Sequence, residues 1–463
     1  MAKNIIVCGA GQVGTTIARQ LAGEGINITV IDTNPELVRR IDESHDIRGI
    51  VGHASHPETL READARDADM LIAVTRSDEV NMVACQVAWS LFGVKRRLAR
   101  LRHGGYTARE AAGLFGPDHL PIDVVISPEA EIADSIARQL RTPGTFDVLP
   151  LATGRLELLG THIEDPECRV VGERIGDLAA QGDFEGLSVM TVVRHGRAFI
   201  PDAGTRLEAG DDVHLLVRSE RRQALMALFG HRERITRDLV IAGGGNIGLH
   251  LARKVTTALA SVRLHLIEHD RGRAQHIAGL LGDRVTVLNG DALDRSLLEE
   301  AQVGRMETLV AVTNDDETNI FCSFQARQLG CRRAITLVNK RSYESLLPQL
   351  GITTVVSPSA ITVSTVLRHV RRGRILALHT LREDFGEVVE AQVDAGSRLL
   401  AGPLAGLPLP AGLKIGAVLR DGRVLMGRPN TRIQAGDHIV AVVAYSDLRA
   451  AESWLGSRHR ATT

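Results

Sequence analysis

Two glycine-rich motifs, one in each half of the 463-residue chain, have the spacing of a dinucleotide-binding turn. The first motif is Gly9-Ala10-Gly11-Gln12-Val13-Gly14, and the second is Gly243-Gly244-Gly245-Asn246-Ile247-Gly248. In such a motif the first glycine permits a tight turn, the second lets the backbone approach a pyrophosphate, and the last lets helix and strand pack closely. Free N–H groups at the N-terminus of the following helix attract phosphate. Each motif follows an apolar run and opens a helical pattern, which favours nucleotide binding over a simple turn.

An acidic residue follows each motif at the distance expected for ribose recognition. Asp32 stands 18 residues after Gly14, and Glu268 stands 20 residues after Gly248. A carboxylate at the end of the second strand accepts hydrogen bonds from ribose hydroxyls and repels a 2′-phosphate. Thr33 rather than an arginine follows Asp32, so the first half favours NAD(H) or another adenine nucleotide over NADP. The alternative is a tight turn without a ligand, which would apply to the second half if it lost binding after duplication.

Groups that could carry catalysis are scarce. None of the three tyrosines begins a Tyr-x-x-x-Lys pair, and no HExxH, GxSxG or P-loop motif is present. His53 and His56 lie in the run Gly52-His53-Ala54-Ser55-His56-Pro57 and could be catalytic or bind a metal. The second half has Gly290-Asp291-Ala292 at the equivalent place, so we interpret His53 as a polar residue near the ribose. We predict no catalytic residue, no metal site and no enzymatic activity.

One arginine could contact a ligand. Arg100 lies in the run Leu98 to Leu101, which we predict to be a strand, and a cation at a strand end beside the crevice could contact a phosphate or an adenine ring. We interpret the other basic clusters, such as Lys95-Arg96-Arg97 and Arg332-Arg333, mostly as solvated helix ends.

The two halves of the chain are repeats of each other. The run Ala73 to Asn81 recurs as Ala311 to Asn319, and the run Arg206 to Asp211 recurs as Arg432 to Asp437. Similar order with similar spacing indicates duplication. The charged stretch 231–237, poor in apolar residues, is the predicted joint.

Each half begins with alternating strand and helix patterns, which specify a parallel sheet covered on both faces. From about Phe146, and again from about Ala377, the pattern changes to short strands and turns. We therefore predict an α/β fold of two Rossmann-like, doubly wound parallel-sheet domains, each followed by a small α+β domain. The expected boundaries are 1–141 and 236–374 for the nucleotide-binding domains, and 142–230 and 375–463 for the small domains.

The composition is that of an ordinary globular protein, with 44% hydrophobic and 24% charged residues. The net charge of −1 argues against nucleic acid as a partner. Five cysteines without a CxxC pair favour a reducing compartment. The first residues lack the layout of a signal peptide, and the uncharged run 345–367 contains prolines and many polar side chains, so we predict no transmembrane helix.

These features together resemble the family of regulator-of-potassium-conductance proteins. The resemblance covers nearly the whole chain. It is carried by the first glycine motif, the run 52–57, residues 73–75 with 78–79, the run Asn81-Met82-Val83-Ala84-Cys85-Gln86 and the run 311–319. The run that begins at Asn81 is more specific than either glycine motif.

The resemblance implies that four chains close a ring of eight nucleotide-binding domains. It implies that NAD(H) and ATP or ADP compete for the first domain as regulatory ligands. It further implies a cytoplasmic protein, peripheral on the inner face of the cell membrane, that gates a potassium-translocating integral membrane subunit and so controls K⁺ uptake. The pocket that it implies consists of residues 9–14, Asp32, Thr33, His53, Thr75, Arg76 and Arg100, with residues 243–248, Glu268, Asp291 and Thr313 in the second half. Arg76 and Gly104-Gly105 depart from the pattern of the family at the pocket rim.

Two alternatives to a regulatory role remain at this point. The first is an NAD-dependent oxidoreductase, for which His53 is the only candidate proton donor in reach of a nicotinamide. The second is a structural or redox-sensing module that serves another partner.

Overall fold

The computed structural model describes residues 3–23, 25–43, 47–107, 111, 113–116, 118–232, 235–259, 261–343, 346–370, 375–382 and 385–455. Three expectations partly fall outside these residues: the joint 231–237, the boundary at 374/375 and the end of the last domain. The chain forms two compact units. Unit 1 comprises Met1–Ala133, Gly245–His250 and Ser357–Val370, and unit 2 comprises Asp134–Gly244, Leu251–Val356 and Arg371–Thr463.

The first nucleotide-binding domain contains a six-stranded parallel sheet in the order β3-β2-β1-β4-β5-β6. Its strands are β1 (Asn4–Cys8), β2 (Asn27–Asp32), β3 (Arg48–Val51), β4 (Met70–Ala73), β5 (Arg96–Arg100) and β6 (Val124–Ile126). Its helices are α1 (Gln12–Gly23), α2 (Pro35–Asp42), α3 (Pro57–Glu62), α4 (Asp78–Phe92), α5 (Gly104–Thr107) and α6 (Pro128–Arg141). The strand order reverses between β1 and β4, which is where ligands bind in such sheets.

The second nucleotide-binding domain repeats this topology in the order β14-β13-β12-β15-β16-β17. Its strands are β12 (Asp238–Ala242), β13 (Arg263–Glu268), β14 (Val285–Asn289), β15 (Thr308–Ala311), β16 (Arg333–Leu337) and β17 (Thr354–Val356). Its helices are α9 (Asn246–Ala258), α10 (Arg271–Leu281), α11 (Arg295–Glu300), α12 (Asp316–Gln328) and α13 (Pro358–Val370).

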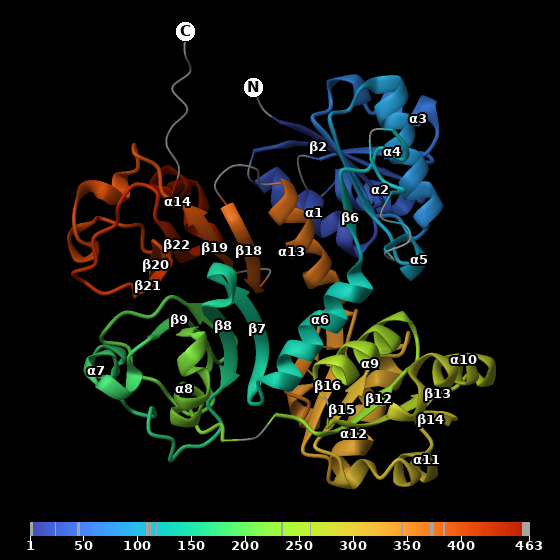
Figure 1. Ribbon diagram of the computed structural model, residues 1–463. Helices are drawn as coiled ribbons and strands as arrows, with labels where there is room; N and C mark the ends of the chain where they lie inside the picture. Colours follow the sequence, from blue (N-terminus) through green and yellow to red (C-terminus); the bar gives the residue numbers. More distant parts are fainter. Residues whose placement is uncertain are drawn as a thin grey trace. The chain divides into compact units, whose positions relative to one another are not determined.

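Helix α13 comes from the second half of the sequence but packs within unit 1. It lies against α1 and β6 of the first nucleotide-binding domain (Figure 1). Its side chains Val363, Val366 and Leu367 are fully buried. Polar contacts support the packing: Gln12 Nε2 donates to Ser359 Oγ at 3.4 Å, and Lys3 Nζ donates to the carbonyl of Val370 at 3.0 Å.

Both small domains are antiparallel sheets with the same topology, in the orders β10-β9-β11-β8-β7 and β18-β19-β22-β20-β21. The first consists of β7 (Thr145–Leu151), β8 (Leu156–His162), β9 (Leu187–Arg194), β10 (Arg197–Phe199), β11 (Asp212–Arg218), α7 (Ile175–Ala180) and α8 (Arg222–Leu228). The second consists of β18 (Ile375–Arg382), β19 (Gly386–Gln392), β20 (Leu413–Arg420), β21 (Arg423–Met426), β22 (His438–Ala444) and α14 (Leu448–Leu455).

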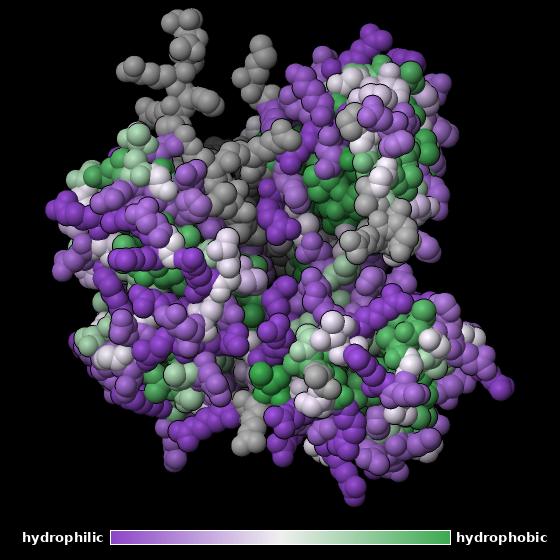
Figure 2. Space-filling view, viewed as in Figure 1, coloured by the Kyte–Doolittle hydropathy of each residue, from purple (hydrophilic) through white to green (hydrophobic). Residues whose placement is uncertain are grey.

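Within unit 2 the two small domains share one hydrophobic core. Buried residues of both sheets form a single cluster, which includes Leu158 and Leu216 from the first and Val388 and Val440 from the second. A hydrogen bond from the backbone N–H of Ala152 to Glu390 Oε2, 2.9 Å long, adds a polar link between them. The surface that Figure 2 shows is mostly hydrophilic, with smaller hydrophobic areas among the hydrophilic side chains.

The predicted strands and helices recur in the structure with ends that shift by a few residues. One interpretation is wrong: Arg96 and Arg97 do not lie at a solvated helix end but in β5, where Arg97 is buried. The burial of the Arg97 charge is compensated because Asp123 forms an ion pair with its guanidinium at 2.9 Å. Asp123 also accepts a hydrogen bond from the backbone N–H of Arg97 at 2.7 Å. Arg333 likewise lies in β16, and its guanidinium donates to the carbonyls of Gln139 and Thr145.

Candidate functional site

The glycines of the first motif have three separate structural roles. Gly9 has a φ of +109°, which favours glycine, and a Cβ there would lie 3.2 Å from the backbone of Thr75. A Cβ on Gly14 would lie 1.8 Å from the carbonyl oxygen of Gly9, so only glycine lets α1 start this close to the turn. A Cβ on Gly11 would meet nothing within 4 Å. The space beside Gly11 is therefore open to a ligand, as phosphate approach requires.

Asp32 connects the end of β2 to this turn. Its Oδ2 accepts a hydrogen bond from the backbone N–H of Ala10 at 2.6 Å, and its Oδ1 accepts one from Asn34 at 2.8 Å. Each carboxylate oxygen has a further lone pair, so Asp32 can still accept hydrogen bonds from ribose hydroxyls. The next residue, Thr33, is exposed.

The second turn is built in the same way around a longer carboxylate. Gly243 has a φ of +110°, and a Cβ on Gly245 would meet nothing within 4 Å. Glu268 Oε2 accepts from the backbone N–H of Gly244 at 2.8 Å, while Oε1 accepts from Asp270 at 2.8 Å. A Cβ on Gly244 would lie 2.4 Å from Ile277 Cδ1 and 2.8 Å from Glu268 Oε2, so the second turn is more closely covered by side chains at this position, where the first turn has alanine.

A buried asparagine fixes the loop after the fourth strand of each nucleotide-binding sheet. Asn81 Oδ1 accepts from the backbone N–H of Thr75 at 3.0 Å, and Asn319 Oδ1 accepts from that of Thr313 at 2.8 Å. Both amides also donate to the neighbouring strand, at the carbonyls of Arg100 and Leu337. These asparagines were not among the predicted site residues. The signal that could have found them is the threonine-to-asparagine spacing of six residues in both halves.

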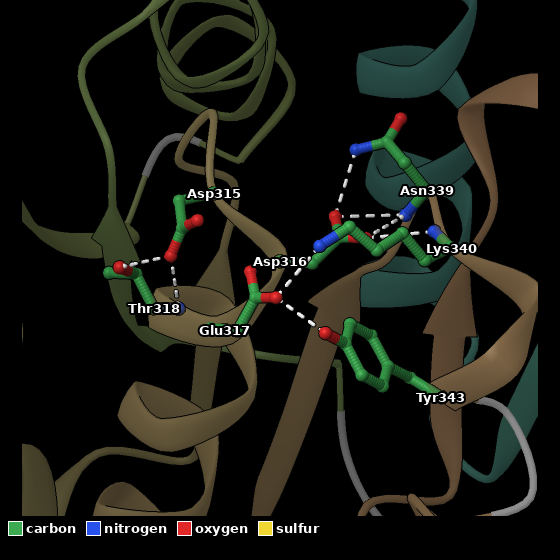
Figure 3. A network of polar contacts seen from close by, with 7 residues as sticks. All are labelled: Asp315, Asp316, Glu317, Thr318, Asn339, Lys340 and Tyr343. Carbon is green, nitrogen blue, oxygen red and sulfur yellow. Dashed lines mark hydrogen bonds and ion pairs between the residues drawn. The ribbon is translucent and has the colours of Figure 1, made fainter.

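The first residue of the following helix is a buried aspartate in both domains. Asp78 accepts hydrogen bonds from the backbone N–H groups of Arg102 and His103. In the second domain Asp316 accepts the equivalent bonds from Asn339 and Lys340 (Figure 3). These bonds hold the loop that follows the fifth strand at the edge of each crevice.

An exposed network lies beside Asp316 in the second domain. Glu317 accepts from Lys340 Nζ at 2.8 Å and from the hydroxyl of Tyr343 (Figure 3). The hydrogen bonds from Lys340 and then Tyr343 lower the pKa of Glu317 to about 2. The charge on Glu317 is thus already compensated within the protein.

The remaining predicted residues lie at the carboxyl ends of the strands. Burial, followed by the charge of Arg102, lowers the pKa of Arg100 to about 10, so Arg100 remains a cation at neutral pH. Arg76 is exposed. His53 Nδ1 lies 2.8 Å from Ser55 Oγ and its ring stacks on His56, so its contacts are local. Asp291 is exposed and accepts from the backbone N–H of Leu293.

Two further findings concern the part of the chain that the structure describes. No group of three or more His, Cys, Asp or Glu side chains in it could hold a metal ion. No helix in it combines the length and apolar character needed to cross a membrane. All five cysteines are buried and unpaired, and burial raises the pKa of Cys8 to about 12.

Comparison with known domain families accounts for most of the chain. The model of the TrkA-N domain matches residues 5–128 and 239–358, and that of the TrkA-C domain matches residues 163–230 and 388–456. This chain belongs to the TrkA family. The resemblance and the fold class predicted from the sequence are confirmed.

Relatives named Trk system potassium uptake protein TrkA extend over nearly the full chain. The protein from Azorhizobium caulinodans is 39% identical over 97% of both chains, and the one from Halomonas elongata is 38% identical over 95% of both. A TrkA homolog from Archaeoglobus fulgidus is 30% identical over 97% of this chain and 99% of its own.

Solved structures show the same fold at lower identity. The RCK domain of GsuK is 20% identical, with a TM-score of 0.58 over 99% of this chain and 96% of its own. The GsuK channel bound to NAD is also 20% identical, with a TM-score of 0.59 over 99% of this chain and 80% of its own. Two domain pairs in one chain are therefore a known arrangement of this fold.

Proposed function

We propose that this protein is a nucleotide-sensing regulatory subunit of potassium uptake that gates a potassium-translocating membrane subunit of the TrkH or TrkG type. The potassium-uptake role rests on the names of relatives that cover nearly the whole chain. The nucleotide role rests on one observation: each glycine turn has an open second glycine beside a carboxylate at the end of the adjacent strand.

The proposed ligands of the first domain are NAD(H) and ATP or ADP, bound by residues 9–14, Asp32, Thr33, His53, Thr75, Arg76 and Arg100. The residues present fit such ligands, because the backbone beside Gly11 is open and Asp32 retains acceptor capacity. Residues 243–248, Glu268, Asp291 and Thr313 are the proposed equivalents in the second domain.

The proposed mechanism is regulation without chemical turnover. A ligand shifts a conformational equilibrium only by binding its two states with different affinities. ATP adds a third phosphate where NAD(H) has a second ribose and nicotinamide, so the two ligands make different contacts with Arg100 and the glycine turn. Neither ligand needs to be consumed for the membrane subunit to respond.

The proposed assembly is a homotetramer whose eight nucleotide-binding domains form a ring at the cytoplasmic face of the membrane. Exposed apolar side chains at equivalent positions support self-association. Val83 on α4 is 46% exposed and Phe321, its counterpart on α12, is 57% exposed. An apolar side chain exposed at the same place in both repeats is consistent with one contact surface used twice in the ring. The domain boundaries given above remain part of this proposal.

The decisive experiment measures potassium uptake in cells that lack their own uptake systems. The membrane subunit is expressed alone, with this chain, and with its Gly11→Val variant. We expect nucleotide-dependent uptake only with the unaltered chain, and co-purification of the membrane subunit with both forms. Equal uptake without the chain would contradict the proposal. Transfer of labelled hydride from NADH to a substrate would instead favour an oxidoreductase.

A further inference from the structure

The helix that follows the second strand of each nucleotide-binding domain lies beside the proposed adenosine end of the site, and its third residue differs in chemical type between the two domains. Helix α2 has Asn34 as its N-cap, and α10 has Asp270 in the same place. Counting from these caps, the third helical residue is Leu37 in the first domain and Arg273 in the second. The duplication therefore places an apolar side chain in one site where the other has a cation.

Arg273 is held at the glycine turn of the second domain. Its Nε donates to the carbonyl of Gly244 at 3.0 Å, while its backbone N–H donates to Asp270 Oδ1 at 2.6 Å. The N–H of the same Gly244 donates to Glu268. Arg273 and Glu268 thus bind the two polar groups of one residue, so both side chains are anchored at the same glycine turn.

The guanidinium keeps binding capacity in this position. Arg273 is half-buried, and among the described residues its two Nη groups have no hydrogen bond or ion pair. Because Nε is fixed, the planar face of the guanidinium and both Nη groups are pre-organised for a further partner. A partner must bind beside a carboxylate that accepts ribose hydroxyls.

We propose that the second nucleotide-binding domain binds an adenine nucleotide and that Arg273 contacts the adenine ring. This inference rests on the proposed function and deepens it. Arginine attracts an aromatic face. A 2′-phosphate is disfavoured because Glu268, at the same turn, is a carboxylate whose two oxygens already accept backbone N–H groups and carry its negative charge. The first domain, with Leu37, lacks this contact. The second domain therefore holds the adenosine part of ADP and NAD⁺ more tightly than the first.

The test uses the full chain with the Gly11→Val substitution, which leaves the second domain as the intact site. Calorimetric titration with ADP, NAD⁺ and NADP⁺ is compared for this background and for added Arg273→Leu, Arg273→Gln and Arg271→Leu substitutions. Leucine is the residue that the first domain carries at this position, and glutamine retains a donor for the Gly244 carbonyl. Arg271, exposed in the same turn of α10, is the control for loss of one positive charge.

We expect both Arg273 substitutions to weaken ADP and NAD⁺ binding about tenfold. Arg271→Leu should leave both affinities unchanged, and thermal unfolding of the variants should match the background. Unchanged affinity after Arg273→Leu, or full affinity in Arg273→Gln, would overturn the proposal and leave Arg273 as a brace of the turn. Preference for NADP⁺ that disappears with Arg273→Leu would show that the cation binds phosphate instead.

A further variant separates this inference from the proposed function. Gly245→Val blocks the second turn, where a Cβ meets nothing within 4 Å, and leaves the first site intact. Binding by Gly245→Val but none by Gly11→Val would overturn the second site alone. No nucleotide binding by the unaltered chain would contradict the proposed function itself.

Discussion

His379 Nε2 and Asp147 Oδ2 lie 2.5 Å apart and join β18 of the second small domain to β7 of the first. Burial alone would lower the pKa of His379, but the charge and hydrogen bond of Asp147 outweigh it and the pKa is raised. Burial alone would raise the pKa of Asp147, but His379 outweighs it and the pKa is lowered. The charges of His214 and Arg138 lower the pKa of Asp147 further. The charge of Arg138 also lowers the pKa of His379, but by less than Asp147 raises it.

This pair predicts a contribution to stability that falls as pH rises through the folded pKa of His379. A histidine whose folded pKa is raised stabilises the protein fully below its unfolded pKa, about 6.5, and the contribution is lost as pH passes the folded value. The aspartate contribution is present above its unfolded pKa, about 3.9, and is lost as pH falls through the lower folded value. We expect His379→Gln to cost about 1–3 kcal/mol near pH 6 and less above pH 8.

Urea unfolding of the full chain at several pH values, for the unaltered protein and the variant, checks this prediction. His276→Gln on the exposed face of α10 is the control and should leave the profile unchanged. A difference between His379→Gln and the unaltered chain that grows with pH would contradict the assignment.

Asp437 is predicted to stabilise the second small domain. It is buried, accepts from Arg420 Nε at 2.9 Å and from Arg420 Nη2 at 2.8 Å, and accepts from the backbone N–H of Gln434. Asp437→Ala should lower the free energy of unfolding by about 3 kcal/mol, since Arg420 and the turn both lose their partner. Thermal unfolding measures the loss, with the exposed Glu220→Ala as control. A loss no larger than that of the control would refute the role.

Gly11 and Gly14 should behave oppositely when substituted. Gly11→Val should fold normally because a Cβ has free space, yet lose nucleotide binding at the first turn because its side chain occupies the phosphate approach. Gly14→Ala should impair folding because its Cβ would lie 1.8 Å from the Gly9 carbonyl oxygen. Circular dichroism and ADP titration distinguish the two when both variants carry Gly245→Val, which blocks the second turn. Normal ADP binding by Gly11→Val in that background would mean that phosphate is held elsewhere.

Asp32→Ala should weaken NADH binding by the first domain. The substitution removes two acceptors for ribose hydroxyls, and we expect a loss of about 2–3 kcal/mol, or roughly 30- to 150-fold in affinity. Calorimetry in a Gly245→Val background confines the measurement to the first site. Asp42→Ala at the C-terminal end of α2 serves as a charge control. Unchanged affinity would exclude Asp32 from the pocket.

Arg100→Ala should reduce the preference for ATP over ADP. Alanine keeps the backbone carbonyl to which Asn81 donates, so the loop after β4 retains its anchor. Loss of a charge-assisted bond to the third phosphate predicts about 2 kcal/mol, or roughly 30-fold, for ATP alone. NADH affinity and assembly state should persist, and ATP-dependent potassium flux should weaken. Equal losses for ATP, ADP and NADH would make Arg100 a general structural residue.

The parts of this fold that could be predicted from the sequence are those set by short-range constraints. The positive φ of Gly9 and the contact of Gly14 with the Gly9 carbonyl arise within the turn itself, and Ser77 caps α4 by accepting from Val80, three residues later. The run from Arg206 to Asp211 recurs because each aspartate binds an arginine of the adjacent strand, Arg194 or Arg420. The repetition of this run in the sequence indicates that these positions are structurally important, although it does not identify the arginines that they bind.

Long-range partners could not be predicted in the same way. Arg97 is buried in β5 only because Asp123, on a distant segment, compensates its charge. The role of Asn81 depends on the position of the Arg100 carbonyl on the neighbouring strand. Nothing in the apolar pattern of α13 indicates that its buried face meets α1 and not the strands that precede it in the chain. Such choices depend on which surfaces meet in three dimensions.

The place of α13 against α1 has a consequence for how this protein arose. A single ancestral half, with one copy of this helix before its small domain, would have needed another copy of itself to supply the helix that covers α1. Fusion of two copies in one gene turns that encounter between molecules into an event within one chain, which no longer depends on protein concentration. Each half is then free to change its own ligand site, because its partner is always present.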